Sequence, residues 1–439
     1  MPNFNRIFAL LAAVTFAAAC QEVPKETGGG LPQSLSEVPA VRLSYRYEPD
    51  VPAPTEQAAA VDDPAKFATV QMKFESTRPQ EFVARTIGSP DGKRVAVVYN
   101  RVGDQPEDYR LDMYASDGTL LNKVTSDLMA VHFPDTIAWS PDSTTIAFVA
   151  MLRAASDADE NAIRPAAGVT EDIADAVQDP EVPLPDANTD PGVSEPPANA
   201  APTPPAPVGI LTFRTEQLYV ADSDGMGARP LTQNESLIYY YYVWSADSTK
   251  LATLAATVAE WQYVKRNAEA AGQVFVPAGR PRVVEKNGRE RLLDDALTSV
   301  QPVWSPDSTK IACAFDKQVR LYDAGGNVPT QAAIPLRNNL LLSSQAYDRD
   351  QSIKLGASNT NGSDNTVVPT NVDANAAPST LPDENTLASF NPIVALHWPT
   401  DDQLYFQTAF IKRMLNETDS VSSFPRWHRL ILTPQASGN

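Results

Sequence analysis

Three histidines are the residues of this chain best suited to acid–base or metal chemistry: His132, His397 and His428. A lyase that works through a bound metal ion would need several imidazoles to converge on that ion. His397 precedes Trp398 and His428 follows Trp427, in apolar segments that we expect to be strands, so positions in a sheet explain both more simply. We therefore expect no shared metal site and no cofactor.

Nucleophilic hydrolysis needs a serine on a strained elbow with histidine and acidic partners. The segment Gly88-Ser89-Pro90-Asp91-Gly92 resembles such an elbow, but its serine is second and not central, so we interpret it as a turn. Cys313 lies in an apolar run, which favours a buried, inert thiol. Carboxylates alone can run glycoside chemistry, and the chain has 54 acids, but those at repeated positions are turn residues. We predict no catalytic residues.

The elements that would have to position such groups follow a short turn that occurs five times. Its copies are Ser89-Pro90-Asp91-Gly92, Trp139-Ser140-Pro141-Asp142, Trp244-Ser245-Ala246-Asp247, Trp304-Ser305-Pro306-Asp307 and Trp398-Pro399-Thr400-Asp401. Proline presets φ at the second position, and the aspartate can bond its own backbone two residues on. Each copy leads into an apolar run that predicts a buried strand, and a second hairpin follows in most units.

A unit of two hairpins repeated at roughly 40 to 60 residues is typical of a propeller blade. We predict an all-β β-propeller of four-stranded blades, with the repeated tryptophans and aspartates as structural positions. Five repeats are clear and six blades are favoured, because the interval from Asp307 to Asp401 has room for a degenerate turn near Tyr347-Asp348-Arg349-Asp350. One blade with a long insert is the alternative there, and counts of five or seven stay open.

The repeats resemble the TolB-like propeller family, in which a W-S-P-D-G turn precedes an apolar strand and an L-Y-x-x-D-x-D-G hairpin. The resemblance covers about residues 82–434. Gly88 stands in place of the first tryptophan, and serine replaces the closing glycine at three positions, which a turn tolerates: Ser143, Ser248 and Ser308. The resemblance implies a periplasmic role in import, envelope integrity or assembly through protein contacts.

The first residues, 1–19, are typical of a signal peptide, because the apolar core Ile7 to Ala18 is too short to span a bilayer. The sequence Ala17-Ala18-Ala19-Cys20 favours lipidation of Cys20; ordinary cleavage with an incidental cysteine is the alternative. We expect a lipid-attached tether over 20–40 and anchoring to an envelope membrane. Gln21 beside the cysteine favours the outer membrane facing the periplasm, with the inner membrane or the cell surface left open.

The propeller is expected over 41–434, followed by a tail at 435–439. Two inserts interrupt it: an acidic segment rich in proline and alanine at 154–207, and a polar loop at 358–385. The acidic segment lacks the apolar surface that would offset its ordering entropy, so we predict that it is disordered.

The net charge of −19 and the pI of about 4.6 disfavour nucleic acid as a partner. The run Tyr239 to Tyr242 either packs between blades or offers aromatic contacts to a partner. The candidate partner surface comprises Tyr240, Tyr242, Trp261, Tyr263, Lys265 and Arg266. We predict a monomeric, non-catalytic, envelope-anchored module that binds or scaffolds envelope proteins and touches the membrane only through its lipid. The alternative is a secreted hydrolase or lyase that acts on a peptide or polysaccharide in the central funnel.

Overall fold

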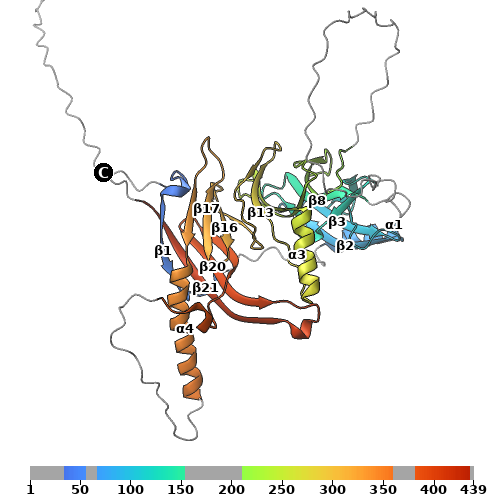
Figure 1. Ribbon diagram of the computed structural model, residues 1–439. Helices are drawn as coiled ribbons and strands as arrows, with labels where there is room; N and C mark the ends of the chain where they lie inside the picture. The colour runs from blue at the N-terminus through green and yellow to red at the C-terminus, as the bar shows by residue number, and fades with distance from the viewer. Residues whose placement is uncertain (1–33, 56–66, 154–209, 359–380, 436–439) are drawn as a thin grey trace, which may run out of the picture.

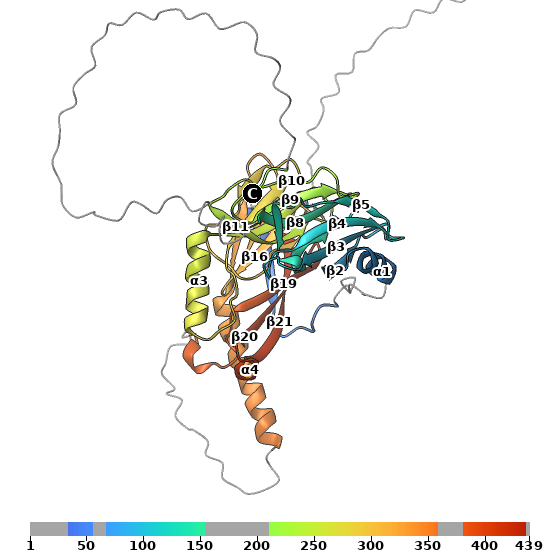
Figure 2. The ribbon, with the colours of Figure 1, turned by 90° about the vertical axis from the view of Figure 1, so that its right-hand side faces the viewer.

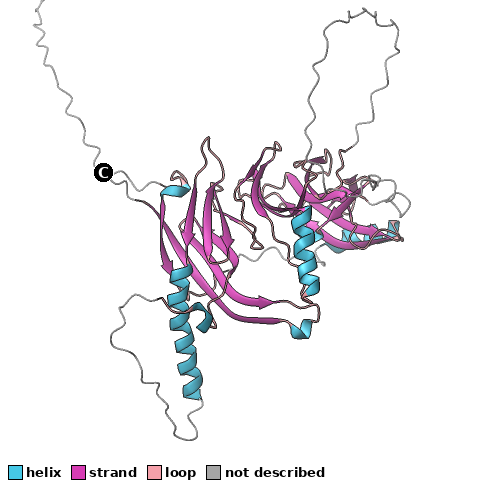
Figure 3. Cartoon of the chain, viewed as in Figure 1, coloured by secondary structure: helices cyan, strands magenta, loops and turns pink. Residues whose placement is uncertain are grey.

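The computed structural model describes residues 34–55, 67–153, 210–358 and 381–435. These residues form five antiparallel sheets that follow one another along the chain (Figures 1 and 3). The expected signal peptide, Cys20, the acidic insert and most of the polar loop lie outside the described residues.

The first three sheets are meanders in which strand order follows the chain. The first contains β2 (Glu81–Gly88), β3 (Arg94–Arg101), β4 (Arg110–Ala115) and β5 (Leu120–Lys123). The second contains β6 (Met129–His132), β7 (Ala138–Trp139), β8 (Thr145–Leu152), β9 (Gln217–Asp222) and β10 (Arg229–Pro230). The third contains β11 (Leu237–Trp244), β12 (Lys250–Thr257), β13 (Arg280–Glu285) and β14 (Glu290–Leu292).

The fourth and fifth sheets follow, and the fifth contains strands from both ends of the described chain. The fourth sheet contains β15 (Val303–Trp304), β16 (Lys310–Phe315), β17 (Gln318–Asp323) and β18 (Gln331–Pro335). The fifth contains β19 (Ile393–Thr400), β20 (Gln403–Lys412), β21 (Val421–Pro434) and the early strand β1 (Leu43–Glu48), which pairs with β21. The helical segments within the described ranges are η1 (Ala40–Arg42), α1 (Ala68–Thr77), η3 (Pro134–Thr136), α3 (Val258–Ala270), α4 (Arg337–Ser358), η4 (Glu384–Thr386) and η5 (Glu417–Asp419).

Residues assigned to the end of the tether belong to the packed body. Val38 is 3 % exposed and Ala40 is 0 % exposed, both in the cluster between the fourth and fifth sheets. The Ala40 N–H donates to the Asp323 carboxylate at 2.9 Å, and Lys310 Nζ donates to the Leu35 carbonyl at 2.7 Å. The packed body therefore begins before residue 41.

The described residues contain five sheets, and a sixth blade is not among them. The segment Tyr347 to Asp350, where we placed a degenerate turn, lies inside α4. From Arg337 to Leu355 the helix has no glycine or proline and a single β-branched residue, which favours helix over strand. It packs on the fifth sheet, where Arg426 donates to Ser344 Oγ at 2.7 Å.

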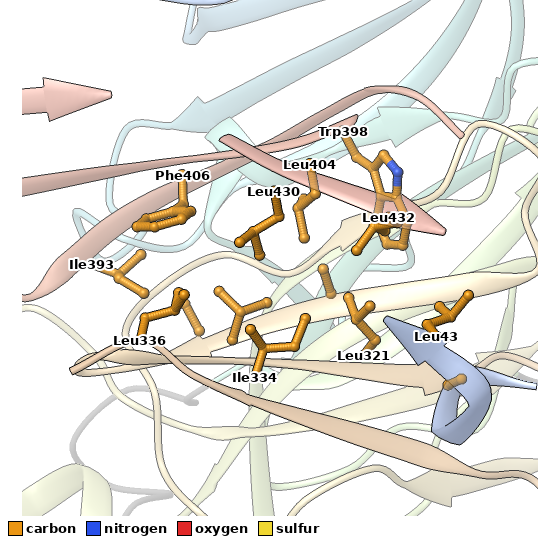
Figure 4. Close-up of a cluster of buried hydrophobic side chains, with 14 of the residues drawn as sticks. Leu43, Leu321, Ile334, Leu336, Ile393, Trp398, Leu404, Phe406, Leu430 and Leu432 are labelled. Atoms are coloured by element: carbon orange, nitrogen blue, oxygen red, sulfur yellow. The ribbon is translucent and has the colours of Figure 1, made fainter. Parts of the chain in front are cut away.

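Clusters of buried apolar side chains join each sheet to the next. Between the fourth and fifth sheets, Leu321 and Ile334 face Phe406 and Leu430 (Figure 4). Inner strands are buried on both faces, as at Val95 to Val98, and therefore show continuous apolar runs instead of alternation. No cluster of described residues joins the fifth sheet to the first.

The repeat turn has the same internal hydrogen bonds in four copies. In each, the serine hydroxyl donates to the carboxylate of the aspartate two residues on, at 2.5 to 2.6 Å. The pairs are Ser89–Asp91, Ser140–Asp142, Ser245–Asp247 and Ser305–Asp307. The bond from Ser89 and the backbone N–H of Lys93 lower the pKa of Asp91 to about 2. These bonds account for the recurrence of serine and aspartate.

The residue after the turn aspartate links neighbouring sheets. Ser143, Ser248 and Ser308 have φ of 60°, 61° and 62°, a left-handed conformation that is costly for a residue with a Cβ. Each hydroxyl accepts the aspartate N–H of the preceding turn at 3.0 Å. We interpreted these serines as tolerated replacements of glycine, but they tie each turn to the next.

The repeated tryptophans make a second link at the same end of the sheets. Trp139, Trp244 and Trp304 are 7 to 8 % exposed, and each indole Nε1 donates to a carbonyl of the preceding sheet at 3.0 to 3.2 Å. Trp398 differs, because it donates to the carbonyl of Asp401 in its own turn at 3.3 Å. The tryptophans therefore act as packing residues between sheets.

No sheet of the described residues precedes the first sheet in the chain, and the turn of this sheet lacks both linking residues. Gly92 faces open space, and a Cβ at Gly88 would lie 2.3 Å from the Phe67 ring. Phe67 and the buried face of α1 pack on the side of the first sheet that holds Val97 and Tyr99. Phe67 thus fills the place that a tryptophan takes in the later turns.

Candidate functional site

The irregular elements of the molecule gather at one end of the sheets. In Figures 1 and 2, α3, α4 and the hairpin of β20 and β21 extend toward the same end, the lower one in both views. These elements follow strands that lead away from the repeat turns. Insertions on one face of a repeat protein commonly build its binding face.

Helix α3 occupies the connection between β12 and β13. A capping box starts it: Glu260 N–H donates to Thr257 Oγ1 at 3.2 Å, and Thr257 N–H donates to the Glu260 carboxylate at 3.0 Å. An ion pair of 2.7 Å between Arg280 and Glu260 fastens the helix start to β13. The chain leaves the helix through Gly272, whose φ of 62° suits glycine.

The segment after α3 reaches across the fourth sheet to the fifth. The Val274 N–H donates to the Arg413 carbonyl at 3.0 Å, and the Leu415 N–H donates to the Gly272 carbonyl at 3.0 Å. Figure 2 shows the end of α3 beside the β20–β21 hairpin. Beneath this bridge the fourth sheet has only the short connection Asp316-Lys317 between β16 and β17.

A cavity of about 750 Å³ lies at this place, which we call the α3–β20 cavity. Its aliphatic walls include Val264, Val274, Val276, Leu297, Ile393 and Ile411. Its polar groups are Asn267, Gln273, Thr298, Ser299, Asp316, Lys412 and Arg413. Thr298 is fixed in position, because its hydroxyl donates to the Ala314 carbonyl at 2.6 Å and accepts the Val300 N–H at 3.0 Å.

Charges of both signs line the cavity. Asp316 has a φ of 51° and a side chain that is 67 % exposed, with Lys317 Nζ at 3.2 Å from its carboxylate. It is the only carboxylate among the described lining residues. Lys412 and Arg413 are exposed, and neither forms an ion pair with a carboxylate in the described part of the chain. The cavity therefore offers a carboxylate and two cations to a ligand.

The structure separates the candidate partner residues into two groups. Tyr240 and Tyr242 are 6 % and 4 % exposed, so they pack between sheets and have little area to offer a partner. Trp261 joins Tyr240 at a centroid distance of 5.4 Å and holds α3 on the third sheet. Tyr263 is 63 % exposed, and Lys265 and Arg266 are also exposed on α3.

None of these six candidate residues lines the α3–β20 cavity. The sequence analysis missed the lining residues because they come from separate segments around α3, Leu297 to Val300, Asp316, β19 and β20. No periodicity or motif connects those segments. The adjacent charges at Asp316-Lys317 and at Lys412-Arg413 are the sequence signals that could have indicated them.

The histidines have contrasting surroundings. Burial tends to lower the pKa of His132, but Glu216 at 3.2 Å and Asp108 at 3.3 Å outweigh burial and raise it. Burial lowers the pKa of His428 to about 3. The described residues contain no group of three or more His, Cys, Asp or Glu side chains that could hold a metal ion. Burial also raises the pKa of the Cys313 thiol.

No family model and no curated protein matches the sequence. Solved structures with a likeness to the chain include an oligogalacturonate lyase in complex with manganese, at 14 % identity and a TM-score of 0.27, covering 58 % of this chain and 48 % of that one. A TolB-like protein from Agrobacterium tumefaciens has 14 % identity and a TM-score of 0.26, covering 58 % and 69 %. Prolyl oligopeptidase B from Galerina marginata has 10 % identity and a TM-score of 0.33, covering 58 % and 29 %.

The chain thus spans about half of the lyase and less than a third of the oligopeptidase. These proteins share the β-propeller fold, and the likeness concerns the fold alone. Several of them are enzymes, including a lyase, an oligopeptidase and a puromycin hydrolase, so our prediction of a non-catalytic scaffold is contradicted. Among the described residues no helix is long and apolar enough to span a bilayer.

Proposed function

We propose that this chain is a hydrolase or lyase that acts on a peptide or polysaccharide, and that the α3–β20 cavity is its substrate site. The observation that carries the proposal is the cavity itself. Its volume of about 750 Å³ lies within the usual range of ligand sites, roughly 300 to 1,000 Å³. Its aliphatic walls with a few polar and charged groups have the composition of such sites.

Asp316 is the group that we propose for proton transfer. A carboxylate can take a proton from substrate or water, and nearby cations stabilise the negative charge that develops. Lys412 and Arg413 line the same cavity and supply such cations. Two-carboxylate glycoside hydrolysis fits less well, because Asp316 has no second carboxylate beside it among the described lining residues.

The proposal is tested by assaying purified protein on peptide and polysaccharide substrates, with D316N as the variant. Asparagine tolerates the left-handed backbone as aspartate does, so the fold should be kept. We expect turnover to fall at least about 100-fold in D316N, the usual contribution of a general acid or base. The matched control is D350N on the exposed part of α4, which should keep full turnover. No turnover by the wild type, or equal turnover by D316N, would contradict the proposal.

We also propose that the protein is a TolB-like propeller that is exported and lipidated at Cys20. Five repeat turns support the family, and the sequence Ala17-Ala18-Ala19-Cys20 supports the lipid anchor. Gln21 supports the outer membrane facing the periplasm. Labelled palmitate should enter the wild type and not Cys20→Ser in cells of the source organism. Equal release of both proteins into the soluble fraction would count against the anchor.

A further inference from the structure

An extended segment at residues 273–278 forms one wall of the α3–β20 cavity. Val274, Val276 and Ala278 line the cavity, whereas Phe275 packs on Trp261 with a centroid distance of 4.8 Å. This alternation is that of a β-strand with one face on α3 and the other on the cavity. Val274 is 40 % exposed and Val276 is 47 % exposed, so the cavity face is open to a ligand.

Only the beginning of this segment has backbone partners. Gln273 forms a bridge with Met414, and the Val274 N–H donates to the Arg413 carbonyl. The backbone groups of Phe275 and Val276 make no hydrogen bond to another backbone group in the described residues. An extended edge with free N–H and C=O groups is the template to which a peptide adds as a further strand.

The charge at the rim complements a carboxylate. Lys412 and Arg413 are exposed cations without an ion pair to a described carboxylate, although the protein has a net charge of −19. The neighbouring carboxylate of Asp316 is held by Lys317 at 3.2 Å. No aromatic side chain, the usual platform for a sugar ring, is among the described lining residues. A peptide with aliphatic side chains and a free carboxylate fits these walls better than a sugar chain.

We infer that the substrate is an extended peptide with aliphatic side chains, which pairs with the free backbone groups of Val276 and places its C-terminal carboxylate against Lys412 and Arg413. The inference rests on the proposed function in taking the cavity as the substrate site, and it names the class of substrate. The valines contact alternate side chains of the peptide, while the backbone N–H and C=O of Val276 pair with the peptide backbone.

The experiment measures binding of a fluorescein-labelled peptide of alternating valine and alanine to the full chain by fluorescence anisotropy. V276E places a charge in the wall, and V276P removes the N–H of the edge. We expect either change to weaken binding at least about tenfold. The control V328E carries the same substitution at a valine that is 83 % exposed in the connection between β17 and β18. It should bind as the wild type does.

A second comparison tests the charge at the rim. The wild type should prefer the free carboxylate of the peptide over its amide by about 2- to 5-fold, the range expected of exposed ion pairs. The double variant K412M/R413M should lose this preference, and the melting temperature of each variant checks that it is folded.

The outcomes separate this inference from the proposed function. No saturable binding by the wild type up to about 1 mM peptide, or equal binding by V276E, overturns the inference. Competition by oleate or by an oligosaccharide that exceeds competition by unlabelled peptide also overturns it. Peptide binding that V276E abolishes, in a protein without turnover on any substrate, supports the peptide site and contradicts the hydrolase or lyase.

Discussion

The repeat-turn end and the cavity end of these sheets are built differently. At the repeat-turn end, serine, aspartate and tryptophan recur in equivalent places, and their polar atoms bond within the turn or to the next turn. At the cavity end, a capped helix, a long hairpin and a two-residue connection meet without repetition. Val276 and the cations Lys412 and Arg413 remain open to solvent there.

The difference indicates that the repeat-turn end contributes stability, whereas the cavity end contributes ligand recognition. The polar groups of the repeat turns hydrogen-bond to one another, so they have no donor or acceptor left for a ligand. Their loss weakens contacts between neighbouring sheets. Groups without a partner inside the protein are free to bind one from outside. We therefore expect substitutions at the repeat-turn end to change stability, and substitutions at the cavity to change binding and turnover.

The largest effect is expected at the repeat-turn end. Trp304→Ala leaves a cavity between the third and fourth sheets and removes the hydrogen bond from Nε1 to the Val243 carbonyl. Urea denaturation should show a loss of about 3 to 5 kcal/mol in the free energy of unfolding. Trp427→Ala, at a half-buried tryptophan of β21, is the control and should cost less. A loss below about 1 kcal/mol in W304A would contradict the structural role.

A pH effect of smaller size is expected at His428, which belongs to β21 and lies on the face of the fifth sheet that α4 covers. Its side chain is fully buried, stacks on Phe406 and bonds the Tyr47 and Thr408 hydroxyls. Its folded pKa of about 3 lies below the unfolded value of about 6.5, so the unfolded state binds more protons between these values. The stability present above pH 6.5 should fall by about 2 to 3 kcal/mol on acidification to pH 4.5.

His132 does not produce a loss of stability between pH 6.5 and 4.5. Its raised pKa means that its contribution is fully present below the unfolded pKa and is lost only as the pH rises through the folded pKa. H428Q keeps hydrogen-bonding capacity without titrating, so its stability should be flatter between pH 6.5 and 4.5. Equal slopes for wild type and H428Q in denaturation curves would show that His428 is not the group responsible.

A still smaller effect is expected at the serines that link the turns. S248A removes the acceptor of the Asp142 N–H and keeps a Cβ at a φ of 61°, so it should cost about 1 to 2 kcal/mol. S248G loses the same bond but relieves the backbone, and should cost less. G92S, at a turn with no preceding sheet, should bring no gain in melting temperature. Unchanged melting of S248A would argue against the link.

The smallest effect on stability is expected at the cavity wall. V276E adds a charge to an exposed side chain that packs against no buried cluster, so unfolding should change by less than about 0.5 kcal/mol. The same variant should lose peptide binding. If the melting temperature of V276E fell as far as that of W304A, the conclusion that the two ends have different roles would be wrong.

Local residue patterns predicted most of the sheet architecture. Turn chemistry at Asp142 and Asp307 and the apolar runs after them locate hairpins, because φ preferences and burial act within a few residues. The same patterns missed α4, since the Asp307 to Asp401 interval was judged by the spacing of turns and not by the absence of helix breakers between Arg337 and Leu355. They also missed the hydrogen bonds of Ser248, whose donor lies 106 residues away.

The sequence by itself determined the repeated unit, the order of the sheets and the conformation of each turn, because these depend on contacts between residues close in the chain. Tertiary structure alone decided which end carries a cavity and which residues line it. Three of the lining residues, Val276, Asp316 and Arg413, lie in connections between strands of three different sheets. They come together only because the segment after α3 crosses the fourth sheet to the β20–β21 hairpin. Whether these residues come together depends on how far and in which direction each connection extends. Local backbone preferences and burial patterns do not determine that.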